Sequence, residues 1–141
     1  MPSVHFFEED VSFFLDNPQK TSDWIKMVIL SEGKQLDTLN FIFCSDEYLL
    51  KLNQKYLNHN TYTDIITFDN SDRPDVLYGD VFISIERVIE NSKKLTVSQD
   101  EELHRVIVHG VLHLLGFSDK TTLQRNQMRK KENAYLSLRT V

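Results

Sequence analysis

Cysteine, glycine and proline are all scarce in this chain of 141 residues, which has one cysteine, four glycines and three prolines. The single cysteine, Cys44, cannot form a disulfide within the chain. It follows the apolar run Phe41-Ile42-Phe43, so we expect a buried structural thiol rather than a reactive one. No internal repeat or low-complexity segment is present either. Nothing therefore indicates a linker, and we expect a single domain over residues 1–141.

Long apolar runs are also missing. A membrane-spanning helix needs roughly 18 or more apolar residues in a row, and no run in this sequence approaches that length. The first ten residues have no basic segment ahead of their apolar ones, and acidic residues follow directly, so they do not resemble a secretory signal. We therefore expect a cytoplasmic protein without a membrane partner.

An excess of positive charge is absent too. Sixteen lysines and arginines stand against 21 aspartates and glutamates, which gives a formal net charge of −5 at pH 7. Nucleic-acid binding draws much of its affinity from cations that contact phosphate, so an RNA partner would need a local basic patch. Solvated helix faces are the alternative explanation for any such cluster. The candidate clusters are Lys51 with Lys55, Lys93 with Lys94, and Arg125 with Arg129, Lys130 and Lys131.

The sequence does contain the patterning of a folded α+β domain. It is 40% hydrophobic and 26% charged, as ordinary globular proteins are. Short β-branched and aromatic runs alternate with segments whose apolar residues have helical spacing. We expect an α+β fold in which a small mixed β-sheet packs with helices. Strands are predicted at residues 4–9, 39–44, 63–68 and 79–84, and helices at 21–33, 45–56, 85–95, 98–115 and from 121 onward.

The strongest local signals lie in the last third of the chain. Ser98-Gln99-Asp100-Glu101 and Thr121-Thr122-Leu123-Gln124 match the capping box that begins a helix. Between them, residues 103–115 are apolar on nearly every side, which is typical of a helix surrounded by protein. Gly116 is placed to end that helix. The sequence therefore predicts a central helix over about residues 98–115.

His109 and His113 lie four residues apart in this predicted helix, so their side chains project from one face, one above the other. Gly116 can adopt a left-handed conformation and turn the chain back, which would bring Asp119 to the same place. Ordinary explanations exist as well, because a lone buried histidine is usually hydrogen-bonded in the core and Asp119 suits a turn. Two histidines in an apolar stretch each need a partner, however, and one metal ion satisfies both. We expect one metal ion, bound by His109, His113 and Asp119.

Such a metal site favours hydrolysis. A zincin peptidase has the sequence His-Glu-x-x-His with the glutamate as general base, whereas this chain has Gly110 at that position. A metal with an open coordination position can still activate water or polarise a phosphoryl oxygen. His104 lies roughly 140° around the helix from His109 and is expected to be structural. His59 is expected to be exposed in a loop.

Three ordered motifs over about residues 52–119 resemble the YbeY family. They are residues 52–56 (LNQKY) followed by 63–68 (TDIITF), then residues 79–84 (GDVFIS), and then residues 102–117 (ELHRVIVHGVLHLLGF). This match is far more specific than a pair of histidines. The resemblance implies a compact α+β fold, one zinc ion and single-strand-specific endoribonuclease activity. It also implies a role in rRNA maturation, especially near the 3′ end of the small-subunit (16S) rRNA, and in ribosome quality control.

The resemblance further implies partners, which are precursor rRNA and the ribosome or small-subunit assembly proteins. Two positions differ from the family pattern. Asp119 replaces a third histidine, and its harder oxygen donor would shift the metal preference. Leu57 replaces an arginine, which removes a cation suited to phosphate. Lys51, Lys55 and Arg87 are then the expected RNA-binding residues.

Asp64 and Asp80 both follow the family motifs, and two interpretations of them stay open. As catalytic acids or bases, or as supports for a metal ligand, they would activate water or orient a histidine. As turn or cap residues at the starts of strands, they would have no chemical role. Thr63 and Thr67 are expected to be strand residues.

The leading hypothesis is a zinc-dependent endoribonuclease. A first alternative is a non-catalytic ribosome-assembly factor with a structural metal, which Leu57 and the net charge of −5 favour. A second is a metallopeptidase-like hydrolase, which would require a glutamate from elsewhere in the chain to face the metal-bound water.

Overall fold

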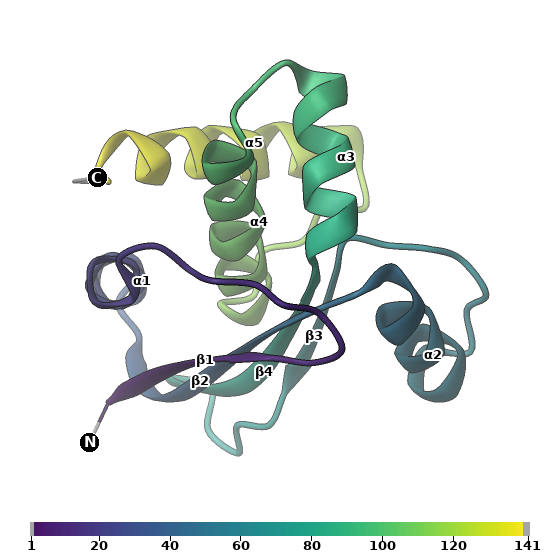
Figure 1. The fold of residues 1–141 in the computed structure, drawn as a ribbon. Coiled ribbons are helices and arrows are strands. Elements are labelled where there is room, and N and C mark those ends of the chain that lie inside the picture. The colour runs from purple at the N-terminus through teal and green to yellow at the C-terminus, as the bar shows by residue number, and fades with distance from the viewer. Residues whose placement is uncertain (1, 140–141) are drawn as a thin grey trace.

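The computed structural model describes residues 2–139. Its strands are β1 (Ser3–Glu8), β2 (Gln35–Cys44), β3 (Ile65–Asp69) and β4 (Val76–Ser84). Within the described residues they form one four-stranded sheet in the order β1-β2-β4-β3 (Figure 1). β1, β2 and β4 are parallel, and β3 is antiparallel to β4. The sheet is therefore mixed, as the sequence predicted.

All five predicted helices are present. They are α1 (Pro18–Ser31), α2 (Asp46–Leu57), α3 (Ile85–Leu95), α4 (Gln99–Leu114) and α5 (Thr122–Ser137). Three elements begin earlier than predicted: β2 at Gln35 rather than at residue 39, β4 at Val76 rather than at residue 79, and α1 at Pro18 rather than at residue 21. β3 begins at Ile65 rather than at residue 63, so the prediction that Thr63 is a strand residue was wrong. Gln35 pairs with Val76. The added part of β2 alternates exposed and half-buried residues, so it lacks the continuous apolar run by which the rest was found.

The helices lie on both faces of the sheet. α1 packs on β1 and β2, α4 packs on β3 and β4, and α3 and α5 contact α4. Figure 1 shows α1, α3, α4 and α5 gathered on one side of the sheet, with α2 apart from them. The main core fills the space between these helices and the sheet, and its fully buried members include Phe41, Val81 and Leu112. Burial of each such side chain contributes about 1.5–3 kcal/mol.

α2 covers the other face of the sheet through a smaller cluster that includes Cys44, Leu49 and Ile66. Successive residues of a strand point to opposite faces, which is why Ile66 joins this cluster while Ile65 packs against the main core. Cys44 is buried, as expected. Burial raises the pKa of its thiol to about 12, so the group stays protonated and unreactive.

The two helices that carry the candidate site begin at the predicted caps. Ser98 accepts a hydrogen bond from the backbone N–H of Glu101 (3.0 Å), which is the N-cap half of the predicted box. Thr121 and Gln124 form the complete reciprocal box, with both bonds at 3.1 Å. Each such cap contributes about 1 kcal/mol to helix stability. Among residues 2–139, no helix is both long enough and apolar enough to cross a membrane.

Candidate metal centre

The C-terminal half of α4 presents His109 and His113 on the same side of the helix, with ring centroids 4.6 Å apart. Their side chains are 22% and 30% exposed, although most of α4 is buried. After the helix, Gly116 has φ +105°, a conformation that residues with a Cβ rarely adopt. This turn sends the chain back along the helix toward the two imidazoles.

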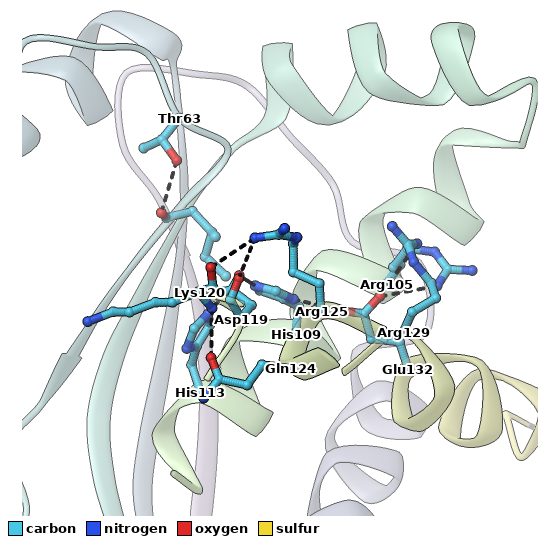
Figure 2. A network of polar contacts seen from close by, with 11 residues as sticks. Thr63, Arg105, His109, His113, Asp119, Lys120, Gln124, Arg125, Arg129 and Glu132 are labelled. Carbon is cyan, nitrogen blue, oxygen red and sulfur yellow. Dashed lines mark hydrogen bonds and ion pairs between the residues drawn. The ribbon is translucent and has the colours of Figure 1, made fainter. Parts of the chain in front are cut away.

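Asp119 completes a three-residue group at the end of this turn (Figure 2). Its Oδ2 lies 3.3 Å from His109 Nε2 and 3.4 Å from His113 Nε2. Both distances exceed the range of about 2.7–3.2 Å for good N–H···O hydrogen bonds. They match the separation of roughly 3.3 Å between neighbouring ligands on a tetrahedral zinc ion with bonds of about 2.0–2.1 Å. The donor set therefore fits one small divalent cation.

The first turns of α5 hold the loop that carries Asp119. Gln124 Oε1 accepts hydrogen bonds from the backbone N–H groups of Lys120 and Thr121, both at 3.1 Å. Arg125 donates to the backbone carbonyl of Lys120 at 3.0 Å. The position of Asp119 thus depends on α5 as well as on the turn at Gly116.

Glu132 of α5 is a site residue that the sequence analysis missed. It is 4% exposed, and its Oε2 accepts a hydrogen bond from His109 Nδ1 at 2.7 Å. Its Oε1 accepts one from Arg105 at 3.2 Å. A signal was present, because Met128, Glu132 and Tyr135 are the buried residues of α5 and share one helical face. A glutamate on the buried stripe of a helix needs a partner.

The charges around His109 determine its protonation. Burial alone would lower the pKa of this imidazole, but the hydrogen bond and negative charge of Glu132, with further contributions from Asp119 and Asp64, raise it overall. In the absence of a metal ion, His109 is therefore readily protonated. A bound cation would replace that proton at Nε2.

A cavity of about 210 Å³ lies beside His109, and Asp64 and Asp119 both line it. Burial raises the pKa of Asp64, and the nearby His109 partly offsets the effect. Glu102 lines the same cavity with 4% exposure. Its Oε1 has no hydrogen-bond partner among the described residues. Burial raises the pKa of Glu102 as well, so two of the acids in this cavity hold their protons more tightly than acids in water.

Asp80 does not join this group. It lies between Gly79 and Val81, which pack against α4, so its own side chain projects from the opposite face of the sheet. There it accepts hydrogen bonds from Asn40 at 3.0 Å and from Asn70 at 3.2 Å. The structure thus places Asp64 beside the His109–His113–Asp119 group and Asp80 on the far side of β4.

A second hollow, of about 450 Å³, opens on the side of His113. Its lining includes Leu57, His59, Tyr62 and Thr63. We call it the His113 groove. Leu57 is 45% exposed and Tyr62 is 51% exposed, and His59 is exposed as expected. Leu57, where the resemblance implied an arginine, therefore presents an apolar side chain to this groove.

The expected RNA-binding cations have different surroundings. Lys51 and Lys55 are exposed on α2, and Lys55 Nζ lies 5.2 Å from the centroid of the Tyr56 ring. Arg87 is paired with Asp46 at 3.0 Å and lies 5.6 Å from the centroid of the Tyr62 ring. The two lysines are thus open to an anionic ligand, whereas the guanidinium of Arg87 is already matched by a carboxylate.

Fold and site together define a compact α+β protein in which a central helix and the loop after it present two imidazoles and one carboxylate that could hold a single metal ion. The family model described as "Endoribonuclease YbeY" matches residues 8–139. Proteins named "Endoribonuclease YbeY" are similar over nearly their whole length. The one from Amoebophilus asiaticus is 48% identical, over 95% of this chain and 91% of its own. The one from Karelsulcia muelleri is 50% identical, over 94% of this chain and 93% of its own.

The chain belongs to the YbeY family, as its motifs indicated. A protein of known solution structure from Thermotoga maritima shares the fold, with a TM-score of 0.65 and 24% identity, over 96% of this chain and 87% of that protein.

Proposed function

We propose that this protein is a zinc-dependent, single-strand-specific endoribonuclease that matures rRNA precursors in the cytoplasm, with action near the 3′ end of 16S rRNA. Its partners would be precursor rRNA and the ribosome or small-subunit assembly proteins. Membership of the YbeY family over residues 8–139 supports the reaction class. The observation that carries the metal assignment is the position of one Asp119 oxygen, 3.3 and 3.4 Å from the two Nε2 atoms of His109 and His113.

The roles of the residues follow from their positions. His109, His113 and Asp119 would hold the ion, which when bound supplies a Lewis acid for water or for a phosphoryl oxygen. Asp64 lines the cavity beside His109, and we propose that its carboxyl group moves a proton during cleavage. Asp80 would act on the other face of the sheet, where its hydrogen bonds tie Asn40 and Asn70 to β4.

The His113 groove is the proposed path of the RNA strand. Tyr62 and His59 offer rings on which unpaired bases can stack, and such stacking favours single strands over duplexes. Lys51 and Lys55 would contact the phosphate backbone from α2. Arg87 would act indirectly, because its contact with the Tyr62 ring and its ion pair with Asp46 hold it beside the groove.

A comparison of the zinc-loaded protein with the His113→Ala variant tests the catalytic assignment. His113 is partly exposed and lies near the end of α4, so its loss should leave the fold intact. Both proteins are checked by circular dichroism and then assayed on single-stranded RNA and on a duplex of the same sequence. We expect the wild type to cut the single strand and the variant to lose this activity. Equal cleavage by both would defeat the assignment.

A structural metal in a non-catalytic assembly factor is the second candidate, and the apolar Leu57 in the groove favours it. Chelation separates the two functions. If chelation melts the fold and the zinc-loaded protein never cuts RNA, the assembly factor is correct. If the fold survives and cleavage stops, the enzyme is correct.

The metallopeptidase alternative has less support from the geometry. A Cβ at Gly110, the position of the peptidase glutamate, would lie 2.7 Å from Ile65 Cδ1. This position therefore faces the sheet and could not present a general base, so a peptidase would still need a glutamate from elsewhere in the chain. Glu132 does not supply it, because its Oε2 is bonded to His109 Nδ1, away from the Nε2 that faces Asp119.

A further inference from the structure

Glu132 is a buried carboxylate at a position where the packing of α5 favours an apolar side chain. The neighbours on its helical face, Met128 and Tyr135, both belong to the main core. A buried charge is costly unless it is paired and hydrogen-bonded. Packing alone therefore does not account for a glutamate at this position, and its contacts must.

Those contacts divide the two carboxylate oxygens between different partners (Figure 2). Oε2 accepts the hydrogen bond from His109 Nδ1 at 2.7 Å. Oε1 faces two guanidinium groups, with Arg105 at 3.2 Å and Arg129 at 3.5 Å. The arginines thus fix the rotation of the carboxylate, and the other oxygen is left to the imidazole.

The bond to Nδ1 decides which nitrogen of His109 can bind a metal ion. A neutral imidazole has one N–H and one lone pair. When Nδ1 donates its hydrogen to Glu132, the lone pair lies on Nε2, the atom that faces Asp119 at 3.3 Å. A carboxylate on the far nitrogen also makes the imidazole a stronger donor.

We propose that Glu132 is a positioning residue of the metal centre, which holds His109 in the Nδ1–H tautomer with Nε2 directed at the ion. This inference rests on the proposed zinc site. Arg105 and Arg129 act through Glu132, because their contacts with Oε1 fix the rotation of its carboxylate.

The first test measures zinc affinity by competition with a coloured chelator. The variants are Glu132→Leu, which keeps a side chain of similar volume, and Glu132→Gln, which keeps an acceptor for Nδ1 but loses the charge. The matched control is Glu102→Gln, because Glu102 is equally buried and lines the same cavity. We expect the zinc affinity to fall roughly 10–100-fold in Glu132→Leu and by a smaller factor in Glu132→Gln. The affinity of the control should equal that of the wild type.

The second test reads the tautomer directly, by long-range ¹H–¹⁵N NMR of the imidazoles in the metal-free protein. The pH is raised until the ¹⁵N shifts of His109 are those of a neutral ring, because Glu132 and Asp119 raise the pKa of this imidazole. We expect His109 to be in the Nδ1–H form in the wild type and in Glu102→Gln. In Glu132→Leu the population should shift toward the Nε2–H form. A purely structural role for Glu132 would lower the melting temperature without moving this population.

The outcomes separate this inference from the proposed function. If Glu132→Leu folds and keeps both the zinc affinity and the Nδ1–H tautomer, the inference is overturned. If Glu132→Leu does not fold, unchanged affinity and tautomer in Glu132→Gln overturn the role of the charge. If the wild type binds no zinc, the proposed function fails, and the tautomer shift still decides whether Glu132 orients His109.

Discussion

Gly110 of α4 lies directly against Ile65, the first residue of β3. A Cβ built on Gly110 would be 2.7 Å from Ile65 Cδ1 and 3.1 Å from Val81 Cγ1. The lack of a side chain at this point lets the helix approach the sheet closely. Because His109 precedes Gly110 and Asp64 precedes Ile65, the same approach brings His109 and Asp64 to one cavity.

Replacement of Gly110 by valine should therefore destabilise the fold. We expect the free energy of unfolding to fall by about 1–3 kcal/mol, because extra methyl groups overpack the contact between α4 and the sheet. Urea denaturation measures the change. Gly110→Ala serves as the control and should cost less, since the Ile65 terminus can move and alanine recovers about 0.5–1 kcal/mol in a helix. A valine variant as stable as the wild type would show that the contact between Gly110 and Ile65 does not set the distance between α4 and the sheet.

The turn at Gly116 permits a test that separates stability from metal binding. Gly116 and Gly33 have positive φ angles of 105° and 76°, and each has open space where a Cβ would be. Alanine at either position should cost about 1–3 kcal/mol of stability through backbone strain. Only Gly116→Ala should also weaken zinc binding, because that turn delivers Asp119. Equal zinc affinities in the two variants, measured by chelator competition, would contradict this.

The sequence predicted the parts of the site that depend on local geometry. The spacing of His109 and His113 and the glycine that follows them are properties of one helix and one turn, so the residues that gather there could be named in advance. Glu132 could not be paired with His109 in the same way. Its contact depends on where α5 crosses α4, and no local pattern encodes that crossing.

Asp64 and Asp80 show a second limit of local patterns. Both lie in family motifs at predicted strand starts, so the sequence analysis gave them the same two interpretations. The structure distinguishes them by their places in the chain. Asp64 lies just before β3, outside the strand, and lines the cavity beside His109. Asp80 lies inside β4, where a shift of one residue moves a side chain to the other face of a sheet. Asp80 neighbours Val81, which faces α4, and therefore faces away from α4 itself. Tertiary packing decides which face of β4 is covered by α4, and the local sequence pattern does not encode it.

His104 should make the fold sensitive to acid independently of any metal. It is 1% exposed, its Nδ1 bonds the carbonyl of Asp100 at 2.7 Å, and its Nε2 contacts Thr21 Oγ1 at 3.2 Å. Burial lowers the pKa of His104 below the ordinary value of 6.5. Arg139 adds to this effect, and Asp100 partly opposes it. As the pH falls, His104 is therefore protonated at a higher pH in the unfolded chain than in the folded protein. Its contribution to the free energy of unfolding is fully present above about pH 6.5 and is lost as the pH falls from there to the lower pKa of the folded state.

Denaturation of the metal-free protein between pH 8 and pH 5 measures this loss. At pH 8, His104→Gln should be less stable than the wild type, because it lacks the hydrogen bonds and packing of the imidazole. Its free energy of unfolding should decrease less steeply than that of the wild type as the pH falls. His109 titrates in the opposite sense, since its pKa is raised. It is present in both proteins, so the difference between them isolates His104. Parallel pH curves for the two proteins would contradict a buried neutral histidine.

Leu57 offers a gain-of-function test of the proposed RNA path. It is 45% exposed and lines the His113 groove, so a larger polar side chain fits there without disturbing the core. Leu57→Arg introduces the arginine that the resemblance implied at this position, and it adds a cation to the groove beside His113. If RNA phosphates pass along this groove, the variant should bind single-stranded RNA more tightly than the wild type.

The salt dependence of binding shows whether the new arginine contacts a phosphate. Each such contact on a single strand releases counterions, so the slope of log affinity against log salt should steepen by about 0.7 in Leu57→Arg. Leu57→Met is the uncharged control and should leave the slope unchanged. Lys55→Met should make it shallower if Lys55 contacts the backbone. An arginine variant that binds RNA with the wild-type slope would place the strand elsewhere, because a cation on the phosphate path cannot leave counterion release unaltered.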